Sequence, residues 1–226
     1  ATAAGAPAEG GEEGGFPWWK KRNQELYDES YQPEQEEIDR HYNYRSPPEL
    51  LKQCDKVLSN YIGSRNYHNF TSGKKPKDPS ARRYMSFFRW NGVKVVDGVE
   101  YASLVVEGQS FMIYQIRKMV GLAVFLVRYN MEPGPAFKKA FSEDKIQIPV
   151  APANGLLLER VLYSAYDKRF NHLPSLSFAD LKAPMEEFKV VVEKEVAAAE
   201  KRGLITLRWL QLLDRHYHQW LTPGTE

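Results

Sequence analysis

The sequence predicts an α+β domain in which helices pack on a largely antiparallel sheet. Three observations carry this prediction. The predicted elements follow the order helix, two strands, helix, helix, strand, and only a short turn separates the two adjacent strands. Of the 226 residues 42% are hydrophobic, which is ample for a core. Two more helices are predicted towards the C-terminus, as a helical extension of the domain.

The first elements are predicted from their start and stop signals. Two prolines and a recurring apolar face predict a helix over 47–63, which ends at a glycine. Residues 64–81 are polar and basic and are predicted to form a loop. Runs of β-branched and aromatic residues predict strands at 83–90 and 99–106, joined by an Asp-Gly turn at 97–98.

The later elements are predicted from apolar periodicity and from Pro and Gly boundaries. In order they are a helix at 111–128, a short helix at 132–141, an edge strand at 146–148, a strand at 156–163 and helices at 184–201 and 204–220.

Charge divides the chain into three parts. We expect a low-complexity and acidic arm at 1–45, a domain at 46–170 and the helical extension at 171–226. Net charge is −5 over residues 1–46, +8 over 47–170 and −1 over the rest. The positive middle part suits a domain that binds a polyanion, although a charged surface without a ligand would also allow it.

Cysteine content and hydropathy limit the compartments in which the protein is expected. Cys54 is the single cysteine, so no internal disulfide can form, which fits a reducing compartment. Charged residues interrupt every apolar run before it is long enough to span a bilayer. We therefore expect an intracellular protein, mitochondrial or nuclear, with no membrane partner.

An arginine interrupts the most apolar predicted helix. Ser110, Tyr114, Arg117 and Gly121 share one stripe of the helix at 111–128, apart from its apolar face. A buried guanidinium needs an anionic partner, either a carboxylate or a phosphate or both. Periodicity alone favours a plainer interpretation, in which Arg117 reaches solvent along the helix surface.

Three stretches, in the same order along the chain, resemble the TruA-type tRNA pseudouridine synthases, closest to their eukaryotic branch. They are FMIYQIRKMVG at 111–121, HNFTS at 68–72 with PSARRY at 79–84, and APANGL at 151–156. The resemblance covers about residues 45 to 170 and corresponds to the C-terminal half of the family fold. It implies a fold of two similar α+β halves with the active-site cleft between them.

The resemblance also implies a chemistry. Pseudouridine formation breaks the N1–C1′ bond of uridine, turns the base and rejoins it through C5, with no metal or organic cofactor. In this family an aspartate of an Arg-Thr-Asp-x-Gly motif, in the first half, is paired by an arginine of the QIRKMVG helix. By its place in the motif, Arg117 is that arginine, and its fork would hold the carboxylate ionised.

Two other positions of the catalytic pocket follow from the same resemblance. Tyr114 stands where the family commonly has histidine; it could stack on a base but does not titrate near neutral pH. Leu156 would line the uracil pocket, and a plain core leucine is an equally good interpretation of it. Together with Arg117 these are the expected catalytic-site residues.

Basic residues around the predicted loop suit RNA phosphates, and nearby aromatic side chains suit stacking. The expected partner is structured RNA, either tRNA or rRNA, read mostly by shape and backbone. The expected RNA-binding residues are His68, Lys74, Lys75, Lys77, Arg82, Arg83 and Lys118.

The aspartate motif is absent from these 226 residues, because no Thr-Asp pair occurs in them. We therefore expect this polypeptide alone to be inactive, and two functions stay open. The chain could be the half of a tRNA pseudouridine synthase that supplies Arg117 and RNA binding. It could instead be a non-catalytic relative that binds RNA and proteins within a ribonucleoprotein such as a mitochondrial ribosome. The arginine helix favours the first, whereas Tyr114 and the missing aspartate favour the second.

Overall fold

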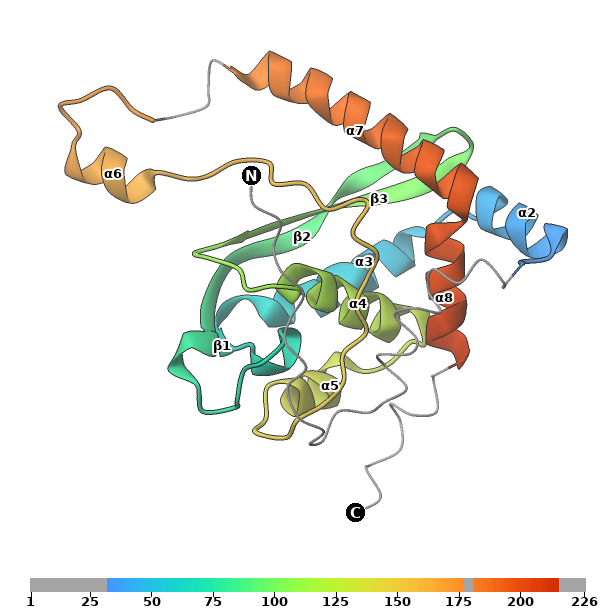
Figure 1. Ribbon diagram of the computed structural model, residues 1–226, viewed down its shortest axis with the longest axis horizontal. Helices are drawn as coiled ribbons and strands as arrows, with labels where there is room; N and C mark the ends of the chain where they lie inside the picture. The colour runs from blue at the N-terminus through green and yellow to red at the C-terminus, as the bar shows by residue number, and fades with distance from the viewer. Residues whose placement is uncertain (1–31, 177–180, 216–226) are drawn as a thin grey trace. The chain divides into compact units, whose positions relative to one another are not determined.

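A three-stranded antiparallel sheet lies at the centre of the described part of the chain, residues 32–176 and 181–215 of the computed structural model (Figure 1). The strands are β1 (Gly63–Asn66), β2 (Arg82–Val96) and β3 (Val99–Gly108), in that spatial order. With the helices below, this sheet confirms the predicted α+β class. Most of the predicted N-terminal arm lies outside the described residues.

The β2–β3 hairpin is the longest feature of the sheet, and its turn was predictable. Val96 pairs with Val99, and both turn residues, Asp97 and Gly98, have positive φ (52° and 90°). Two residues with positive φ form a type I′ turn, whose twist matches that of the flanking strands. Two register shifts interrupt β2, which lets so long a strand bend.

Two helices, α3 (Pro48–Leu58) and α4 (Gln115–Arg128), pack against each other, and α3 also contacts β2 (Figure 1). Met85 and Phe88 of β2 are buried in the core. A short helix, α5 (Pro133–Ala140), begins with proline in its first turn, as predicted. No helix in the described ranges is both long and apolar enough to cross a bilayer.

Aromatic rings fill the core beside α4. The ring centroids of Tyr61 and Phe137 are 4.7 Å apart, and those of Tyr67 and Phe70 are 5.3 Å apart. The Tyr61 hydroxyl donates to the Met119 carbonyl oxygen of α4 at 2.9 Å. The chain around 61–70 is therefore anchored to the helix by packing and by a buried hydrogen bond.

The C-terminal extension is helical, as predicted. It contains α7 (Lys182–Gly203) and α8 (Ile205–Arg215), and a short helix that was not predicted, α6 (Ser164–Arg169), precedes it. The Arg128 guanidinium at the end of α4 donates to both carboxylate oxygens of Asp214 in α8, at 2.8 and 2.7 Å. The compact unit that contains these helices begins at Pro33.

One buried carboxylate connects three helices. Glu200 of α7 is 1% exposed and accepts the Thr206 backbone N–H at the start of α8, at 2.8 Å. Its other oxygen lies 3.4 Å from Nε2 of His41, which belongs to the N-terminal helix α2 (Gln35–Asn43). Burial by itself would raise the pKa of Glu200, but the hydrogen bonds from His41 and Thr206 lower it below its usual value.

Four predicted elements are wrong in detail. Residues 64–66, expected in a loop, belong to β1, which pairs with β2. Neither 146–148 nor 156–163 is a strand, and the helix expected from residue 111 begins at Gln115. The segment 146–148 packs on the core without a ladder: Ile148 is buried, and the Ile146 N–H donates to the side chain of Asn69. A strand needs a neighbour to bond with, and for 156–163 the described residues provide none.

Candidate functional site

The turn before α4 has a strained backbone and is fixed from two sides. Tyr114 has φ 62° and ψ −5°, the left-handed region that a bulky residue rarely adopts. The Met112 N–H donates to the side-chain oxygen of buried Gln115 at 2.9 Å. The Thr71 hydroxyl donates to the Ile113 carbonyl oxygen, also at 2.9 Å. Such strain costs about 1–3 kcal/mol, and it is found most often at functional sites.

Arg117 lies in the first turn of α4, half-buried and held by a second segment. Its Nε donates to the Ala151 carbonyl oxygen at 2.7 Å, and the Ala151 N–H donates back to the Arg117 carbonyl oxygen at 3.1 Å. The guanidinium carbon lies 5.6 Å from the centroid of the Tyr114 ring. Within the described ranges, no carboxylate pairs with this guanidinium. The Nε side of the guanidinium is therefore fixed, and its terminal nitrogens are left for an anion.

A glycine one turn further along α4 makes this contact possible. A Cβ placed on Gly121 would lie 2.0 Å from the Pro149 carbonyl oxygen and 2.8 Å from the carbonyl carbon. Only the absence of a side chain lets the segment of Pro149 approach the helix this closely. The same approach brings Ala151 within hydrogen-bond distance of Arg117.

Of the expected RNA-binding residues, His68 is buried and Lys118 is half-buried with its ammonium bonded inside the protein. The Lys118 ammonium donates to the carbonyl oxygens of Asn69 and Thr71, at 3.0 and 3.2 Å, and burial lowers its pKa to about 8. His68 is 4% exposed, and its Nδ1 lies 3.2 Å from the side-chain oxygen of Asn66. Lys118 therefore holds the 68–72 loop against α4, whereas His68 contacts the end of β1, and both side chains are engaged within the protein.

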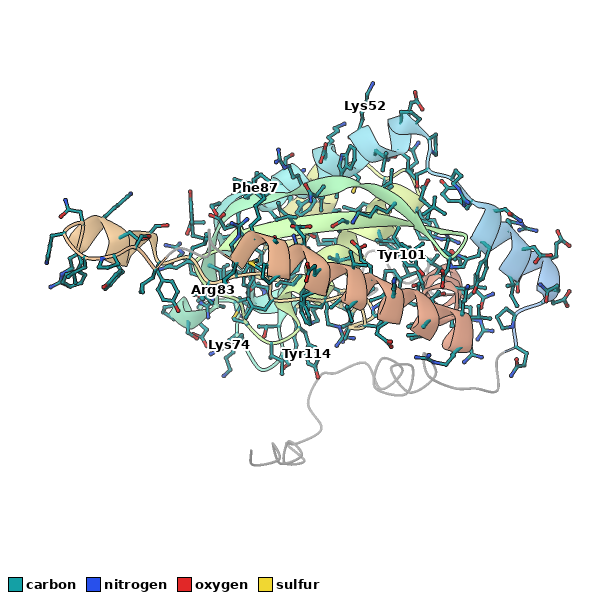
Figure 2. All side chains as sticks on the ribbon, turned by 90° about the horizontal axis from the view of Figure 1, so that it is seen from above. Lys52, Lys74, Arg83, Phe87, Tyr101 and Tyr114 are labelled. Atoms are coloured by element: carbon teal, nitrogen blue, oxygen red, sulfur yellow. The ribbon has the colours of Figure 1, made fainter. Side chains whose placement is uncertain are left out.

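The other basic residues lie on the loop and at the start of β2, and the loop is locally ordered. Lys74 contacts Ser80 at 2.6 Å and Asp78 at 3.3 Å, and Asp78 also accepts the Ser80 N–H. Hydrogen bonds from Ser80 lower the pKa of Asp78. In the view of Figure 2, Lys74 and Tyr114 project from the same side. The loop therefore presents its cations on a framework that is already formed.

The remaining predicted cations differ in how free they are. Lys77 lies 3.4 Å from Glu143, and Arg83 donates to the Ser80 carbonyl oxygen. Lys75 and Arg82 are exposed and pair with no carboxylate in the part of the chain that the structure describes. Of the predicted RNA-binding cations, these two are therefore the most accessible to a phosphate.

Leu156 is not in a core. It is 51% exposed, and its N–H donates to the Ala153 carbonyl oxygen in the turn that follows Ala151. The turn thus connects the segment that holds Arg117 to the exposed segment 156–163. Whether Leu156 lines a uracil pocket stays a prediction.

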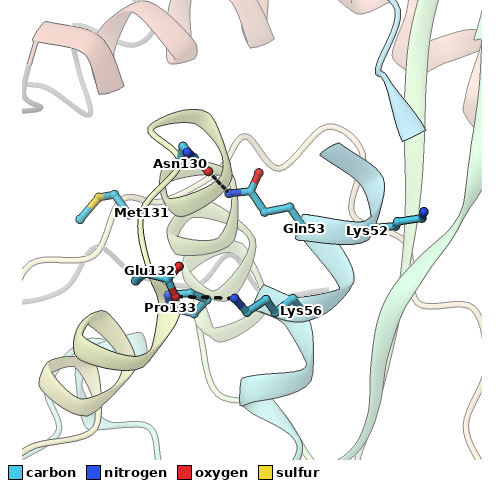
Figure 3. Close-up of a pocket in the computed structure, with 7 residues that line it drawn as sticks. All are labelled: Lys52, Gln53, Lys56, Asn130, Met131, Glu132 and Pro133. Carbon is cyan, nitrogen blue, oxygen red and sulfur yellow. Dashed lines mark hydrogen bonds and ion pairs between the residues drawn. The ribbon is translucent and has the colours of Figure 1, made fainter. Parts of the chain in front are cut away.

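The cavity of Figure 3 is separate from these residues. It has a volume of about 400 Å³ and lies between α3 and the chain that follows α4. Gln53 bonds to Asn130 and Lys56 pairs with Glu132 across it. None of the predicted site residues lines it, and no cluster of metal-ligating side chains occurs among the described residues.

Three motifs that are far apart in sequence therefore meet around Arg117. Thr71 and Lys118 join the 68–72 stretch to α4, and Ala151 joins the 151–156 stretch to it. Sequence reasoning missed the two contacts that position the turn and the guanidinium, the Thr71 hydroxyl and the Ala151 carbonyl. A backbone carbonyl has no sequence signal, but a glycine at position 121 beside an arginine stripe hinted at close approach.

Comparisons with known proteins agree with the motifs. Residues 57–164 match the family model described as tRNA pseudouridine synthase. The Pseudouridylate synthase 1 homolog of Mus musculus is 39% identical over 184 residues, 77% of this chain and 42% of the relative. The Homo sapiens protein of the same name is 39% identical over 76% of this chain and 41% of its own length. The tRNA pseudouridine synthase 1 of Yarrowia lipolytica is 37% identical, over 71% of this chain and 31% of its own length.

The chain thus spans about two fifths of the length of the first two relatives and less of the third, mostly in their C-terminal part. The resemblance drawn from the motifs is confirmed, including the half of the fold that it pointed to. Through residues 57–164, this chain belongs to the tRNA pseudouridine synthase family.

Proposed function

We propose that this chain supplies the C-terminal half of a pseudouridine synthase site and acts on structured RNA such as tRNA. The observation that carries the proposal is the state of Arg117. Its Nε is bound to Ala151, while its terminal nitrogens have no carboxylate partner in the described residues. A guanidinium held in this way suits a carboxylate that arrives from outside, through two parallel hydrogen bonds.

The carboxylate would be the aspartate of the family motif, carried by the portion of the longer relatives that this chain does not match. A guanidinium held beside this carboxylate would favour the ionised form of the carboxylate. The target uridine would have to leave its stack to reach the site. The N1–C1′ bond then breaks, the base turns and C5 bonds to C1′. The C5 proton is lost to solvent, and N1 takes up a proton from solvent, so the product is an isomer of the substrate.

The exposed cations of the loop and of the start of β2 would bind the RNA backbone. Lys75 and Arg82 are free of carboxylate partners among the described residues, and Lys74 is held at the same loop by Ser80. Phosphate contacts of this kind position an RNA without reading its bases, and they weaken as salt is raised.

The test is a single-chain fusion in which the N-terminal portion of the mouse relative precedes this chain. Activity is measured as tritium released from tRNA that carries [5-³H]uridine, because C5 loses its hydrogen. We expect the fusion to be active and the chain alone to be inactive. Arg117→Lys should lower kcat about 100-fold, since a single ammonium cannot reproduce the bidentate fork.

Arg202→Lys is the matched control, because Arg202 is exposed near the end of α7 and makes no ion pair within the described residues. It should leave kcat unchanged. Full activity of the Arg117→Lys fusion, or product made by the chain alone, would contradict the proposal.

A second candidate is a non-catalytic RNA- and protein-binding component of a ribonucleoprotein such as a mitochondrial ribosome. Tyr114, which stands in place of the usual histidine, favours it. In that case the chain alone would bind tRNA or rRNA in filter-binding assays, and the fusion would release no tritium.

A further inference from the structure

Ser80 lies at the centre of the hydrogen bonds that order the basic loop. Its hydroxyl donates to Oδ1 of Asp78 at 2.6 Å and accepts a hydrogen bond from the Lys74 ammonium, also at 2.6 Å. The Ser80 carbonyl oxygen accepts a hydrogen bond from the Arg83 guanidinium at 2.6 Å. Figure 2 shows Lys74 and Arg83 in the same part of the molecule. One residue therefore contacts a carboxylate and two cations.

The Ser80 hydroxyl is also within reach of an enzyme. Ser80 is exposed and belongs to a single turn of 3-10 helix, Pro79–Ala81. Two backbone hydrogen bonds close this turn, and they come from the N–H groups of Ala81 and Arg82. A single turn closed in this way opens at little cost in free energy, because few contacts are lost. The chain around Ser80 can therefore enter the extended substrate groove of a modifying enzyme.

The residues around Ser80 indicate which kind of enzyme this is. Lys77 stands three residues before Ser80, and Arg82 and Arg83 stand two and three residues after it. No other Ser or Thr of the sequence has a Lys or Arg at both the third position before it and the second position after it. Cations on both sides of a hydroxyl suit a serine kinase with an acidic substrate groove, because complementary charges steer the substrate and fix its register.

We propose that Ser80 is a phosphorylation site, and that a phosphate at this position weakens the binding of RNA by the loop. This inference rests on the proposed function, in which the loop cations bind RNA phosphates. The phosphate donor is ATP. The Ser80 oxygen bonds to the γ-phosphorus, the bond from that phosphorus to the β–γ bridging oxygen breaks, and ADP leaves. The hydroxyl proton passes to a base of the kinase.

The new phosphate would compete with RNA for the same cations. A phosphoserine carries about −1.5 to −2 charges at pH 7 and has three strong acceptor oxygens. Lys74 already contacts the Ser80 oxygen, and Arg83 contacts the carbonyl oxygen of the same residue, so both cations are placed to bind the phosphate. Asp78 would lose the proton that it accepts from the hydroxyl and would be repelled.

The charge of the RNA-binding surface would fall by about half. Residues 74–83, the loop and the start of β2, carry five cations and one carboxylate, and the phosphate offsets about two of these cations. Arg117 and the turn at Tyr114 are held by other residues, Ala151 and Thr71. The phosphate should therefore raise the KM for RNA and leave kcat unchanged.

The test treats the 226-residue chain with ATP and the catalytic domain of protein kinase C, and mass spectrometry locates the phosphate. We expect the phosphate at Ser80. In filter-binding assays at about 0.1 M salt, the affinity for tRNA should fall about 10-fold. The slope of log affinity against log salt concentration should become shallower by about 1 to 2, because one or two phosphate contacts are lost.

Two variants separate Ser80 from other sites. Kinase and ATP should leave the RNA affinity of Ser80→Ala as it was before treatment. Ser142→Ala is the matched control, because Lys139 precedes Ser142 by the same three residues but Asp144 follows it by two. An acidic groove repels that carboxylate, so Ser142→Ala should take up phosphate at Ser80 and lose RNA affinity as the wild type does.

A second measurement shows whether the loop holds the phosphate. Because Lys74 and Arg83 favour the dianion, the phosphate should titrate below the usual pKa of about 6 in ³¹P NMR. A phosphate that titrates like free phosphoserine would overturn the competition for these cations. No phosphate at Ser80, or unchanged affinity for tRNA after phosphorylation, would overturn the inference as a whole.

These outcomes are separable from those of the proposed function. Tritium release by the fusion that is unaffected by phosphate at Ser80, at any RNA concentration, would keep the role of Arg117 and remove the regulation. RNA binding that falls on phosphorylation in a fusion that releases no tritium would keep the regulation and remove the catalytic role. An unmodified chain that does not bind tRNA would remove both.

Discussion

Gly121→Ala is the substitution for which the structure predicts the clearest effect. The added Cβ would lie 2.0 Å from the Pro149 carbonyl oxygen. Favourable contact between heavy atoms begins near 3.5 Å, so the carbonyl would have to move by about 1.5 Å. Backbone cannot swing aside like the end of a flexible side chain, and the movement would pull Ala151 away from Arg117.

The magnitude follows from three terms. Alanine is a better helix former than glycine by about 1 kcal/mol, which favours the variant. Overpacking a core contact costs about 1–3 kcal/mol. Loss of the charge-assisted hydrogen bond from Arg117 to Ala151 costs about 1.5–3 kcal/mol, nearer the lower end because Arg117 is half-exposed. We expect the free energy of unfolding to fall by about 2–4 kcal/mol.

Urea unfolding followed by tryptophan fluorescence measures this change. Gly134→Ala is the control, because a Cβ at Gly134 in α5 has no atom within 4 Å. It should stay within about 1 kcal/mol of the wild type. If Gly121→Ala were as stable as the wild type, the close approach of Pro149 to α4 would be refuted, together with the explanation of how Arg117 is held.

Two further predictions concern pH. Lys118 has a pKa of about 8, below its unfolded value, so between pH 8 and 9.5 the folded chain releases a proton that the unfolded chain keeps. The wild type should gain about 2 kcal/mol over that range relative to Lys118→Met in urea unfolding, and parallel curves would refute the burial of the ammonium. The pKa of Glu200 is lowered, so its stabilisation is complete above pH 4.5 and is lost as pH falls through the folded pKa. In thermal unfolding, the Glu200→Gln variant should therefore lose less stability than the wild type between pH 7 and pH 3. An equal loss would show that Glu200 does not contribute to the pH dependence of stability.

The parts of the fold that depend on nearby residues were predictable. The Asp97-Gly98 turn sets the β2–β3 hairpin because both residues tolerate positive φ. The start of α3 follows from its two prolines, and α7 and α8 follow from apolar periodicity. The strand prediction for 156–163 was wrong for a physical reason. Strand propensity is a local property, but a strand forms only where another strand lies beside it.

The candidate site was predictable in its centre and not in its surroundings. Arg117 was found from its motif, and the structure adds the Ala151 carbonyl and the Tyr114 ring around it. The sequence predicts that Lys118 binds RNA, because nothing in it shows that Asn69 and Thr71 place their carbonyl oxygens beside the ammonium. Burial is a property of the folded chain, and a single sequence gives only its average tendency for each residue type.

The contacts at the far end of α4 decide where this protein can be cut. The charge distribution predicts a boundary near residue 170. However, Asp214 forms an ion pair with Arg128 across that boundary, and Glu200 connects α2, α7 and α8. A fragment that ended near residue 170 would lose the ion pair between Arg128, at the end of the helix that carries Arg117, and Asp214. It would also expose the surface that α8 covers. Recombinant fragments intended for crystallisation or for binding assays should therefore extend from before residue 33 to beyond residue 215.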